Sequence, residues 1–281
     1  MNKILIILIF LTGINLGFSR ENESNKWFFS KEKAIKGVAF TLHGLNSWPS
    51  TMDPIALFLN KKGIHVLRGA LKGHQGSYEE MEHVSREIWF SETSALYQEA
   101  LKKSKELKVP LYFVGYSIGA LLFMDLISNS PEKIEVEKMI LFSPAISIRA
   151  HLRFFSFIFY LPGSLKLPSR NLPEYRSDDY TPFAAYDALW KSYGRINWDK
   201  ITPPKALIIM DSDDELISFG GVERIVKKIP EWELFEVDTS GSRNSGKYHH
   251  LTFNEKCYAI GVWENIEKKM ENFLWPYPGT P

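Results

Sequence analysis

The residues best suited to chemistry form the pentapeptide Gly115-Tyr116-Ser117-Ile118-Gly119. It follows the apolar run PLYFV, typical of a buried strand, and precedes the helical sequence IGALLFMDLIS. In a strand-to-helix turn of this kind the serine hydroxyl stands above the sheet edge, and the glycines permit the close approach of neighbouring chain. The helix N-terminus behind the serine also favours negative charge. The pattern predicts a nucleophilic serine, with a helix-capping serine as the plain alternative.

A nucleophilic serine needs a base, and the base needs an acid that fixes its tautomer. Two groups further along the chain could supply them. The acidic stretch Asp211-Ser212-Asp213-Asp214-Glu215 follows the apolar run KALIIM, and His249-His250 follow the run LFEV and a polar loop. The chain order of serine, acid and histidine is the one found with such a strand-turn-helix serine.

The elements that must position these groups alternate between short apolar runs and amphipathic stretches. Strands are predicted at Gly37–Leu42, Ile64–Leu67, Pro110–Gly115, Lys138–Phe142, Lys205–Met210 and Leu234–Val237. Helices are predicted at Met52–Lys61, Ser85–Lys105, Ile118–Ser128, Gly221–Lys228 and Val262–Phe273. This alternation indicates a mostly parallel sheet with helices on both faces. Ligands of such sheets bind beyond the carboxyl ends of the strands, where the serine, the acids and the histidines all fall.

The composition excludes several classes of protein. The 281 residues include 34 Lys and Arg against 33 Asp and Glu, so no net field would attract nucleic acid. Cys257 is the only cysteine, so neither an intramolecular disulfide nor a cysteine metal cluster can form within the chain. The seven histidines lack the spacing of a metal site. We therefore expect no cofactor, no metal and no nucleic-acid partner.

The N-terminal segment has the pattern of a signal peptide. Lys3 precedes an apolar run from Ile4 to Phe18, and small residues at Gly17 and Ser19 suit a signal peptidase. The run is shorter than the roughly 20 apolar residues that cross a bilayer. We expect residues 1–19 to be removed on export to the periplasm or medium, leaving one domain at 20–281. An uncleaved membrane anchor is the alternative.

Together these features resemble the α/β-hydrolase superfamily, and within it the bacterial carboxylesterases and monoacylglycerol lipase-like enzymes. The resemblance covers about Gly37 to Leu274 and includes Leu42-His43-Gly44-Leu45 after the first core strand. It implies an α/β-hydrolase fold with an oxyanion hole built from the backbone N–H groups of Leu45 and Ile118. His43 would then shape this loop rather than act as the base.

The resemblance also assigns the acid and the base. In the family the acid precedes a short apolar pair, which selects Asp214 over Asp211 and Asp213; the family usually has glycine where Asp211 stands. The family pattern around the histidine selects His249, with His250 as the alternative. The implied catalytic set is Ser117, Asp214 and His249, which would cleave carboxylic esters through an acyl-enzyme. Acyl transfer, lactone or peptide hydrolysis, and a non-catalytic binding protein are the other hypotheses.

A long connection between Phe142 and Lys205 completes the sequence prediction. It spans about sixty residues, which is longer than an ordinary connection in an α/β unit, and 12 of the 39 aromatic residues lie within Ala150–Lys200. The family inserts its cap here, so we predict a cap at about 146–200, with a helix packed into the core as the alternative. Phe155, Phe159 and Leu161 are candidates for the wall of an acyl-chain pocket. The expected partner is a small ester or lipid, and the cap could touch a membrane surface transiently.

Overall fold

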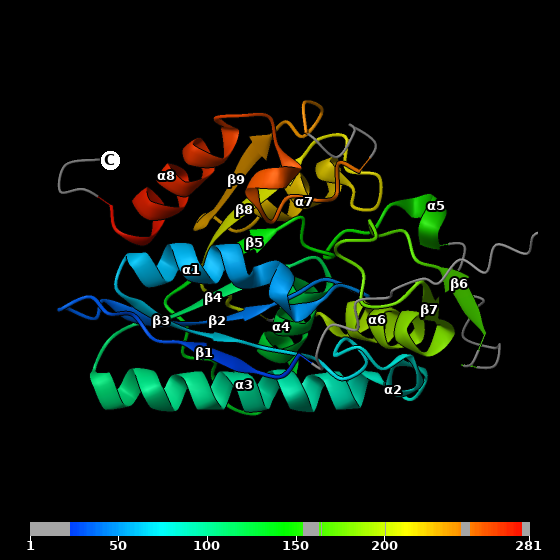
Figure 1. The fold of residues 1–281 in the computed structure, drawn as a ribbon, viewed down its shortest axis with the longest axis horizontal. Coiled ribbons are helices and arrows are strands. Elements are labelled where there is room, and N and C mark those ends of the chain that lie inside the picture. Colours follow the sequence, from blue (N-terminus) through cyan, green and yellow to red (C-terminus); the bar gives the residue numbers. More distant parts are fainter. Residues whose placement is uncertain (1–22, 154–162, 164, 200, 243–247, 277–281) are drawn as a thin grey trace, which may run out of the picture.

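A seven-stranded sheet forms the centre of the computed structural model, which describes residues 23–153, 163, 165–199, 201–242 and 248–276 (Figure 1). Its strands lie in the order β1-β3-β2-β4-β5-β8-β9. All neighbouring pairs are parallel except β1 with β3. The strands are β1 (Lys26–Phe28), β2 (Gly37–Leu42), β3 (Ile64–Arg68), β4 (Leu111–Tyr116), β5 (Lys138–Phe142), β8 (Lys205–Asp211) and β9 (Trp232–Val237).

Helices cover both faces of this sheet, as the sequence predicts. Successive side chains of a strand point to opposite faces, and a layer of helices covers each face, so the central strands carry apolar residues on both faces. In β4, Phe113 packs toward α3 (Arg86–Leu107) and α4 (Ile118–Asn129), whereas Tyr112 and Val114 belong to the core on the side of α1 (Asp53–Lys61) and α8 (Val262–Leu274). The two helical layers are visible above and below the strands in Figure 1.

The predicted elements are present with ends that differ by at most two residues from those read in the sequence. The alternation of strands and helices is therefore confirmed. The remaining elements of the main domain are the single-turn helices η1 (Pro49–Met52) and η3 (Glu255–Cys257), the short helix α2 (Tyr78–Glu82) and α7 (Phe219–Val226). Of these, only α7 has a counterpart in the sequence prediction.

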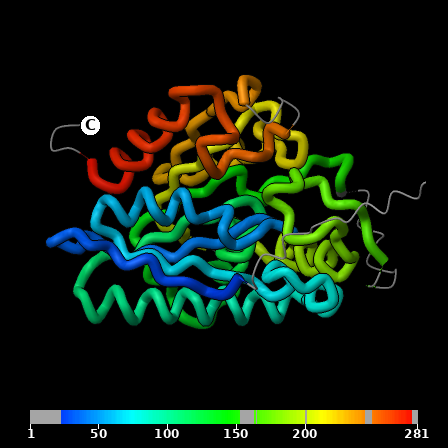
Figure 2. The backbone as a smooth tube through the Cα atoms, viewed as in Figure 1, coloured from blue at the N-terminus to red at the C-terminus, as the bar shows by residue number. Residues whose placement is uncertain are grey.

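The long connection between β5 and β8 has its own small elements, and we call it the insertion. It contains α5 (Ala150–Arg153), β6 (Lys166–Pro168), β7 (Tyr180–Pro182) and α6 (Phe183–Arg195), with β6 and β7 paired antiparallel. In α6 the buried positions Ala185, Ala188 and Ser192 repeat every three or four residues, so one helical face packs inward. Figure 2 shows this yellow-green part of the chain at one end of the molecule.

Two of the sequence predictions lie outside the described residues. The proposed signal peptide at 1–19 is one, and the three candidate wall residues Phe155, Phe159 and Leu161 are the other. Within the described ranges, no helix combines the length and the apolar character needed to span a bilayer.

Candidate active site

Ser117 lies in a strained turn between β4 and α4. Its backbone has φ 51° and ψ −113°, in the left-handed half of φ space that a residue with a Cβ rarely adopts. The flanking glycines explain how the turn fits. A Cβ on Gly119 would lie 2.5 Å from the carbonyl oxygen of Leu42, and one on Gly115 would lie 2.8 Å from Cα of Ala120. The glycines are therefore required by close backbone packing around the serine.

A continuous hydrogen-bond chain joins Ser117 to a histidine and a carboxylate. Nε2 of His250 lies 2.8 Å from Oγ of Ser117, and Nδ1 of His250 lies 2.8 Å from Oδ2 of Asp214. With Nδ1–H donating to the carboxylate, Nε2 is left to accept the serine proton. The three side chains come from the loops after β4, β8 and β9, at the carboxyl edge of the parallel sheet.

The prediction of His249 as the histidine of this set is wrong, and its alternative His250 takes the place. His249 turns away from the serine, and its Nδ1 lies 3.1 Å from Oδ2 of Asp211 and 3.0 Å from Oγ1 of Thr239. Adjacent residues in this turn direct their side chains to different partners, and the backbone path that decides between them cannot be read from a motif. The structure thus contains two neighbouring Asp–His pairs, of which one reaches Ser117.

Among the acidic residues after β8, Asp214 is the one whose carboxylate lies behind this histidine. Its side chain is fully buried, and Oδ1 accepts hydrogen bonds from the amides of Leu216 and Ile217 at 2.9 and 2.8 Å. These two amides belong to the apolar pair that the family pattern places after the acid. They leave Oδ2 free to face His250, so the acid is fixed in position as well as in charge.

The surroundings of His250 favour its protonated form. Burial disfavours the charged imidazolium, but the Asp214 carboxylate and the nearby Glu215 outweigh it, so the pKa of His250 is raised above its ordinary value. Glu215 also accepts a hydrogen bond from the backbone N–H of His250 at 3.0 Å. A histidine with these partners readily accepts a proton from the serine and stabilises the resulting positive charge.

Of the two predicted oxyanion donors, Leu45 lines the same cavity as Ser117, and Ile118 directly follows the serine in the chain. Ile118 is the first residue of α4, so its N–H has no acceptor within the helix. Leu45 follows β2 and lines the cavity beside the serine. The peptide group that carries the Leu45 N–H is held from the other side, because its carbonyl, that of Gly44, accepts from Nδ1 of His43 at 2.9 Å. In a trans peptide the N–H points opposite to the C=O.

His43 is a structural histidine, as the sequence predicts. It is fully buried, and its Nε2 accepts a hydrogen bond from the amide of Leu71 at 3.2 Å, which assigns the proton to Nδ1. Burial lowers the pKa of His43 to about 4. The ring is therefore neutral at ordinary pH and keeps the tautomer that donates to Gly44.

The cavity around Ser117 has a volume of about 290 Å³ and a mainly apolar wall. The insertion supplies much of that wall, including Tyr186, Leu189 and Trp190, which sequence reasoning placed in an aromatic-rich segment without identifying them individually. Arg170 is the only Lys or Arg among the described lining residues, and none of those residues is Asp or Glu. A small cavity with a mainly apolar wall and one arginine among its described lining residues is thus built on the nucleophile.

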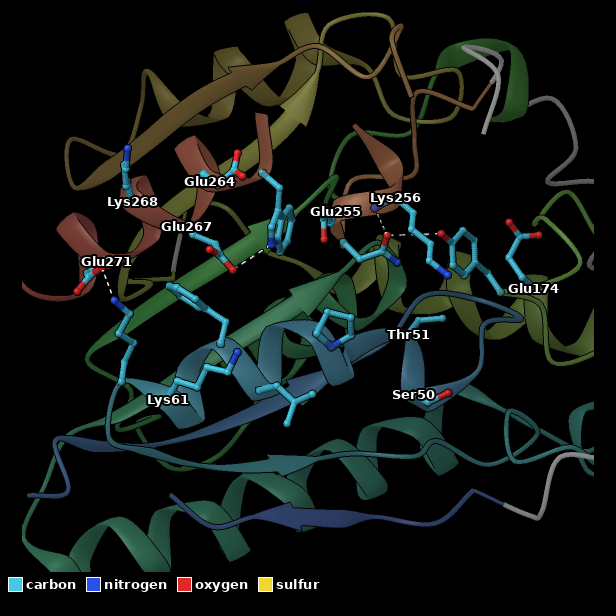
Figure 3. A pocket seen from close by; sticks show the side chains of 17 residues that line it. Ser50, Thr51, Lys61, Glu174, Glu255, Lys256, Glu264, Glu267, Lys268 and Glu271 are labelled. Carbon is cyan, nitrogen blue, oxygen red and sulfur yellow. Dashed lines mark hydrogen bonds and ion pairs between the residues drawn. The ribbon is translucent and has the colours of Figure 1, made fainter. Parts of the chain in front are cut away.

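A larger groove of about 920 Å³ lies elsewhere, between α1, α8 and η3 (Figure 3). Lysines and glutamates line it, among them Lys61, Lys268 and Glu264. Ser117 and His250 are not part of it, and no histidine is among its described lining residues. Within the described part of the chain, no cluster of three or more His, Cys, Asp or Glu side chains is arranged to hold a metal ion.

Comparison with known families gives one match that covers most of the domain. The model of the Hydrolase_4 family, described as serine aminopeptidase S33, matches residues 33–198. The matched part includes the strand-to-helix turn at Ser117 and nearly all of the insertion. Comparison with curated protein sequences gave no significant match.

Solved structures of similar fold include three proteins of distant sequence. A soluble variant of monoglyceride lipase from Saccharomyces cerevisiae, in complex with a substrate analogue, has a TM-score of 0.74 at 13% identity, with 91% of this chain and 92% of that chain covered. A monoacylglycerol lipase from Paleococcus ferrophilus has a TM-score of 0.64 at 17% identity, covering 89% and 97%. Est1E from Butyrivibrio proteoclasticus with bound ferulic acid has a TM-score of 0.63 at 17% identity, covering 89% and 93%. At these sequence identities, the structural similarity shows a shared fold and nothing finer.

Proposed function

Because the chain belongs to the Hydrolase_4 family of α/β-hydrolases, we propose that it is a serine hydrolase that cleaves carboxylic esters with an apolar acyl group. The observation that carries the proposal is the unbroken hydrogen-bond chain from Ser117 through His250 to Asp214. Such a chain is what acyl transfer to a serine requires.

In the proposed reaction His250 removes the proton of Ser117 as Oγ attacks the ester carbonyl. The carbonyl oxygen becomes an oxyanion that accepts hydrogen bonds from the amides of Leu45 and Ile118, each donor typically contributing about 3–4 kcal/mol. His250 then protonates the departing alcohol. Asp214 keeps the imidazole in the required tautomer and stabilises its positive charge. Water, activated by His250, finally releases the acid and restores Ser117.

The cavity supports an apolar acyl group. Ile148, Leu152, Leu189, Trp190 and Leu216 contribute aliphatic and aromatic surface to its wall. Apolar walls with few polar groups suit a ligand whose binding depends on buried hydrocarbon. The two lipases of similar fold act on monoacylglycerols by name, which supports acyl glycerols as a substrate class to test first.

Peptide hydrolysis is the second candidate, because the family description names a serine aminopeptidase. An aminopeptidase must hold the positively charged amino terminus of its substrate, which calls for a carboxylate in the site. The described lining residues include no Asp or Glu, and residues 154–162 and 164 contain none in their sequence. Arg170 would repel an ammonium group. These observations favour ester over aminopeptidase activity.

A chain-length series tests the proposal. The purified domain is assayed with 4-nitrophenyl esters and monoacylglycerols of increasing acyl length, together with an aminoacyl 4-nitroanilide. We expect ester turnover that Ser117→Ala lowers by a factor of about 10⁴ or more with the unfolding midpoint little changed. Retained ester turnover in that variant, or turnover of the anilide alone, would reject the proposal.

We also propose that the protein is exported, as the N-terminal pattern predicts. The first described residues are bound to the domain: Glu23 accepts hydrogen bonds from the amide and hydroxyl of Ser50, and Asn25 accepts from the amide of Ala70. Cleavage after Ser19 would preserve these contacts. Cell fractionation and N-terminal sequencing of the recovered protein test the proposal; a chain that retains Met1 in the cytoplasmic fraction would reject it.

A further inference from the structure

Asn46, the residue after the predicted oxyanion donor Leu45, is a hydrogen-bonding centre. It is almost fully buried and has a φ of 48°, a conformation that asparagine tolerates better than most residues. Its Nδ2 donates to the carbonyls of Asp178 and Tyr180 and to Oγ1 of Thr181, at 2.9, 3.2 and 2.9 Å. Its Oδ1 accepts from the hydroxyl of Ser177 and the amide of Asp178 at 2.8 and 2.9 Å. Every side-chain partner belongs to the insertion.

A second asparagine makes the reverse connection, from the insertion to the loop. Nδ2 of Asn171 donates to the backbone carbonyls of Leu45 and Asn46, both at 2.8 Å, and to Oγ of Ser47 at 3.2 Å. The main chains are also paired. Ser47 forms an antiparallel bridge with Arg176, and the amide of Ser177 donates to the carbonyl of Asn46 at 3.2 Å. The loop after β2 and residues 171–181 thus form one bonded unit.

These contacts fix the two peptide groups on either side of Leu45. His43 holds the carbonyl of Gly44, and Asn171 holds the carbonyl of Leu45. With both planes held, the direction of the Leu45 N–H is set before a substrate arrives. An oxyanion donor is effective when it is already aimed at the position of the developing charge, because no reorganisation is then needed during the reaction.

We propose that Asn171 and Asn46 are positioning residues for the oxyanion hole, so that residues 171–181 of the insertion belong to the catalytic machinery rather than only covering it. The inference rests on the proposed function, because it assigns a role in that reaction. Both asparagines also line the cavity, so the inference is that loss of their hydrogen bonds lowers kcat by a larger factor than it raises KM.

Asn171→Ala is the main test, with Asn171→Asp as a second variant of similar shape that cannot donate. We expect kcat for 4-nitrophenyl butyrate to fall about 10- to 100-fold, with KM within about twofold of the wild-type value. The second readout is the inhibition constant of a trifluoromethyl ketone. Addition of Ser117 Oγ to its carbonyl moves the serine proton to His250 and leaves an oxyanion in the hole, so the inhibition constant should rise in parallel with the fall in kcat/KM.

Asn129→Ala is the matched control. Nδ2 of Asn129 also makes three hydrogen bonds, to the carbonyl and Oδ1 of Asp125 and to the carbonyl of Arg195 at the end of α6. This asparagine likewise joins the main domain to the insertion, but it connects the ends of α4 and α6 and makes none of its three hydrogen bonds to the loop that contains Leu45. We expect a similar change in unfolding midpoint and no change in kcat or in the inhibition constant.

The outcomes separate this inference from the proposed function. The inference is overturned if either Asn171 variant folds and keeps both its kcat and its ketone inhibition constant within twofold of the wild-type values. An equal loss of both in Asn129→Ala would overturn it too. If the wild type cleaves no ester but its Ser117 is labelled by a fluorophosphonate, the proposed function fails. The labelling rates of the Asn171 variants, compared with those of wild type and Asn129→Ala, then test the inference, and rates within twofold of wild type overturn it. A wild type that neither turns over esters nor reacts with the fluorophosphonate rejects both.

Discussion

Nε2 of His250 lies 2.8 Å from Oγ of Ser117, whereas the preceding residue, His249, directs its ring to Asp211. Two adjacent histidines therefore face two carboxylates three residues apart, each with its own partner. The buried pair includes the nucleophile in its hydrogen-bond chain, and the more exposed pair does not. This division gives a direct way to test the site.

Replacement of the two histidines by alanine should have opposite consequences for activity. His250→Ala removes the proposed base and should lower kcat for 4-nitrophenyl butyrate by about 10⁴-fold or more. His249→Ala removes a group that does not touch the serine and should leave kcat within about threefold. Steady-state kinetics of both purified variants provide the measurement; the reverse pattern would restore His249 as the base.

The activity should be lost as the pH falls through a value above the ordinary histidine pKa of about 6.5. His250 must be neutral to accept the serine proton, and although burial opposes the charged ring, the nearby carboxylates raise its pKa. Glu215→Gln removes one of these charges and should move the acid limb of kcat/KM to lower pH. The pH–rate profiles of wild type and variant measure the two midpoints, and an unmoved limb would contradict the stated cause.

The Asp211–His249 pair should stabilise the fold over a limited pH range. Burial raises the pKa of Asp211, but hydrogen bonds from Thr239, Asp213 and His249 outweigh this and lower it. Burial disfavours the charged form of His249, but Asp211 and other nearby carboxylates outweigh burial and raise its pKa. The contribution is lost as pH rises through the raised histidine pKa, and also as pH falls through the lowered carboxyl pKa. His249→Ala should thus cost about 1 kcal/mol of unfolding free energy near pH 5.5 and less near pH 9, measured by urea titration.

Two glycine-to-alanine changes should shift stability in opposite directions. A methyl group at Gly119 would lie 2.5 and 2.7 Å from the carbonyl oxygens of Leu42 and His43, so Gly119→Ala should destabilise the fold by about 3 kcal/mol or more and abolish activity. Gly194 in α6 has nothing within 4 Å of such a methyl group, and Gly194→Ala should stabilise by about 0.5–1 kcal/mol. Urea unfolding of both variants checks the contrast, and a tolerated Gly119→Ala would refute the packing argument.

Arg170 should favour ligands that carry negative charge. It is the only Lys or Arg among the described residues of the cavity wall, where no Asp or Glu neutralises it. Competitive inhibition by a fatty acid should therefore be stronger than by the matching alcohol, and Arg170→Gln should reduce this preference about tenfold. Lys166→Gln is the control, because its ammonium lies over the rings of Tyr78 and Tyr180. Inhibition that is equal for acid and alcohol in the wild type would exclude this role.

The fold could be predicted because its signals are local. Apolar runs such as those around Val38 and Ile140 are buried on both faces and alternate with amphipathic stretches, so their periods identify strands and helices without any long-range information. The glycines of the elbow and the apolar pair after Asp214 are likewise short-range features. The glycines point to the serine because the close backbone packing around it leaves no room for a Cβ. The apolar pair points to Asp214 only through the family resemblance, and in the structure its two amides donate to the Asp214 carboxylate.

The choice between His249 and His250 and the composition of the cavity wall depend on contacts between distant segments. A one-residue difference reverses which side chain faces Ser117, and neither a motif nor a periodicity resolves it. No spacing distinguishes the wall residues Arg170, Tyr186 and Trp190 from other polar or aromatic residues of the insertion. The same is true of the asparagines that join the insertion to the loop after β2.

The sequence alone therefore predicted the doubly covered parallel sheet and the position of Ser117 in a strand-to-helix turn, because both follow from backbone sterics and burial within a few residues. The choice of Asp214 as the acid came from the resemblance to a known family. Only the tertiary structure decided that His250 is the histidine beside the serine. It also decided that Asn46 and Asn171 join the insertion to the loop after β2 by hydrogen bonds. Those relationships join residues up to 135 positions apart in the chain. Their hydrogen bonds exist only when separate segments are packed together, so no local pattern encodes them.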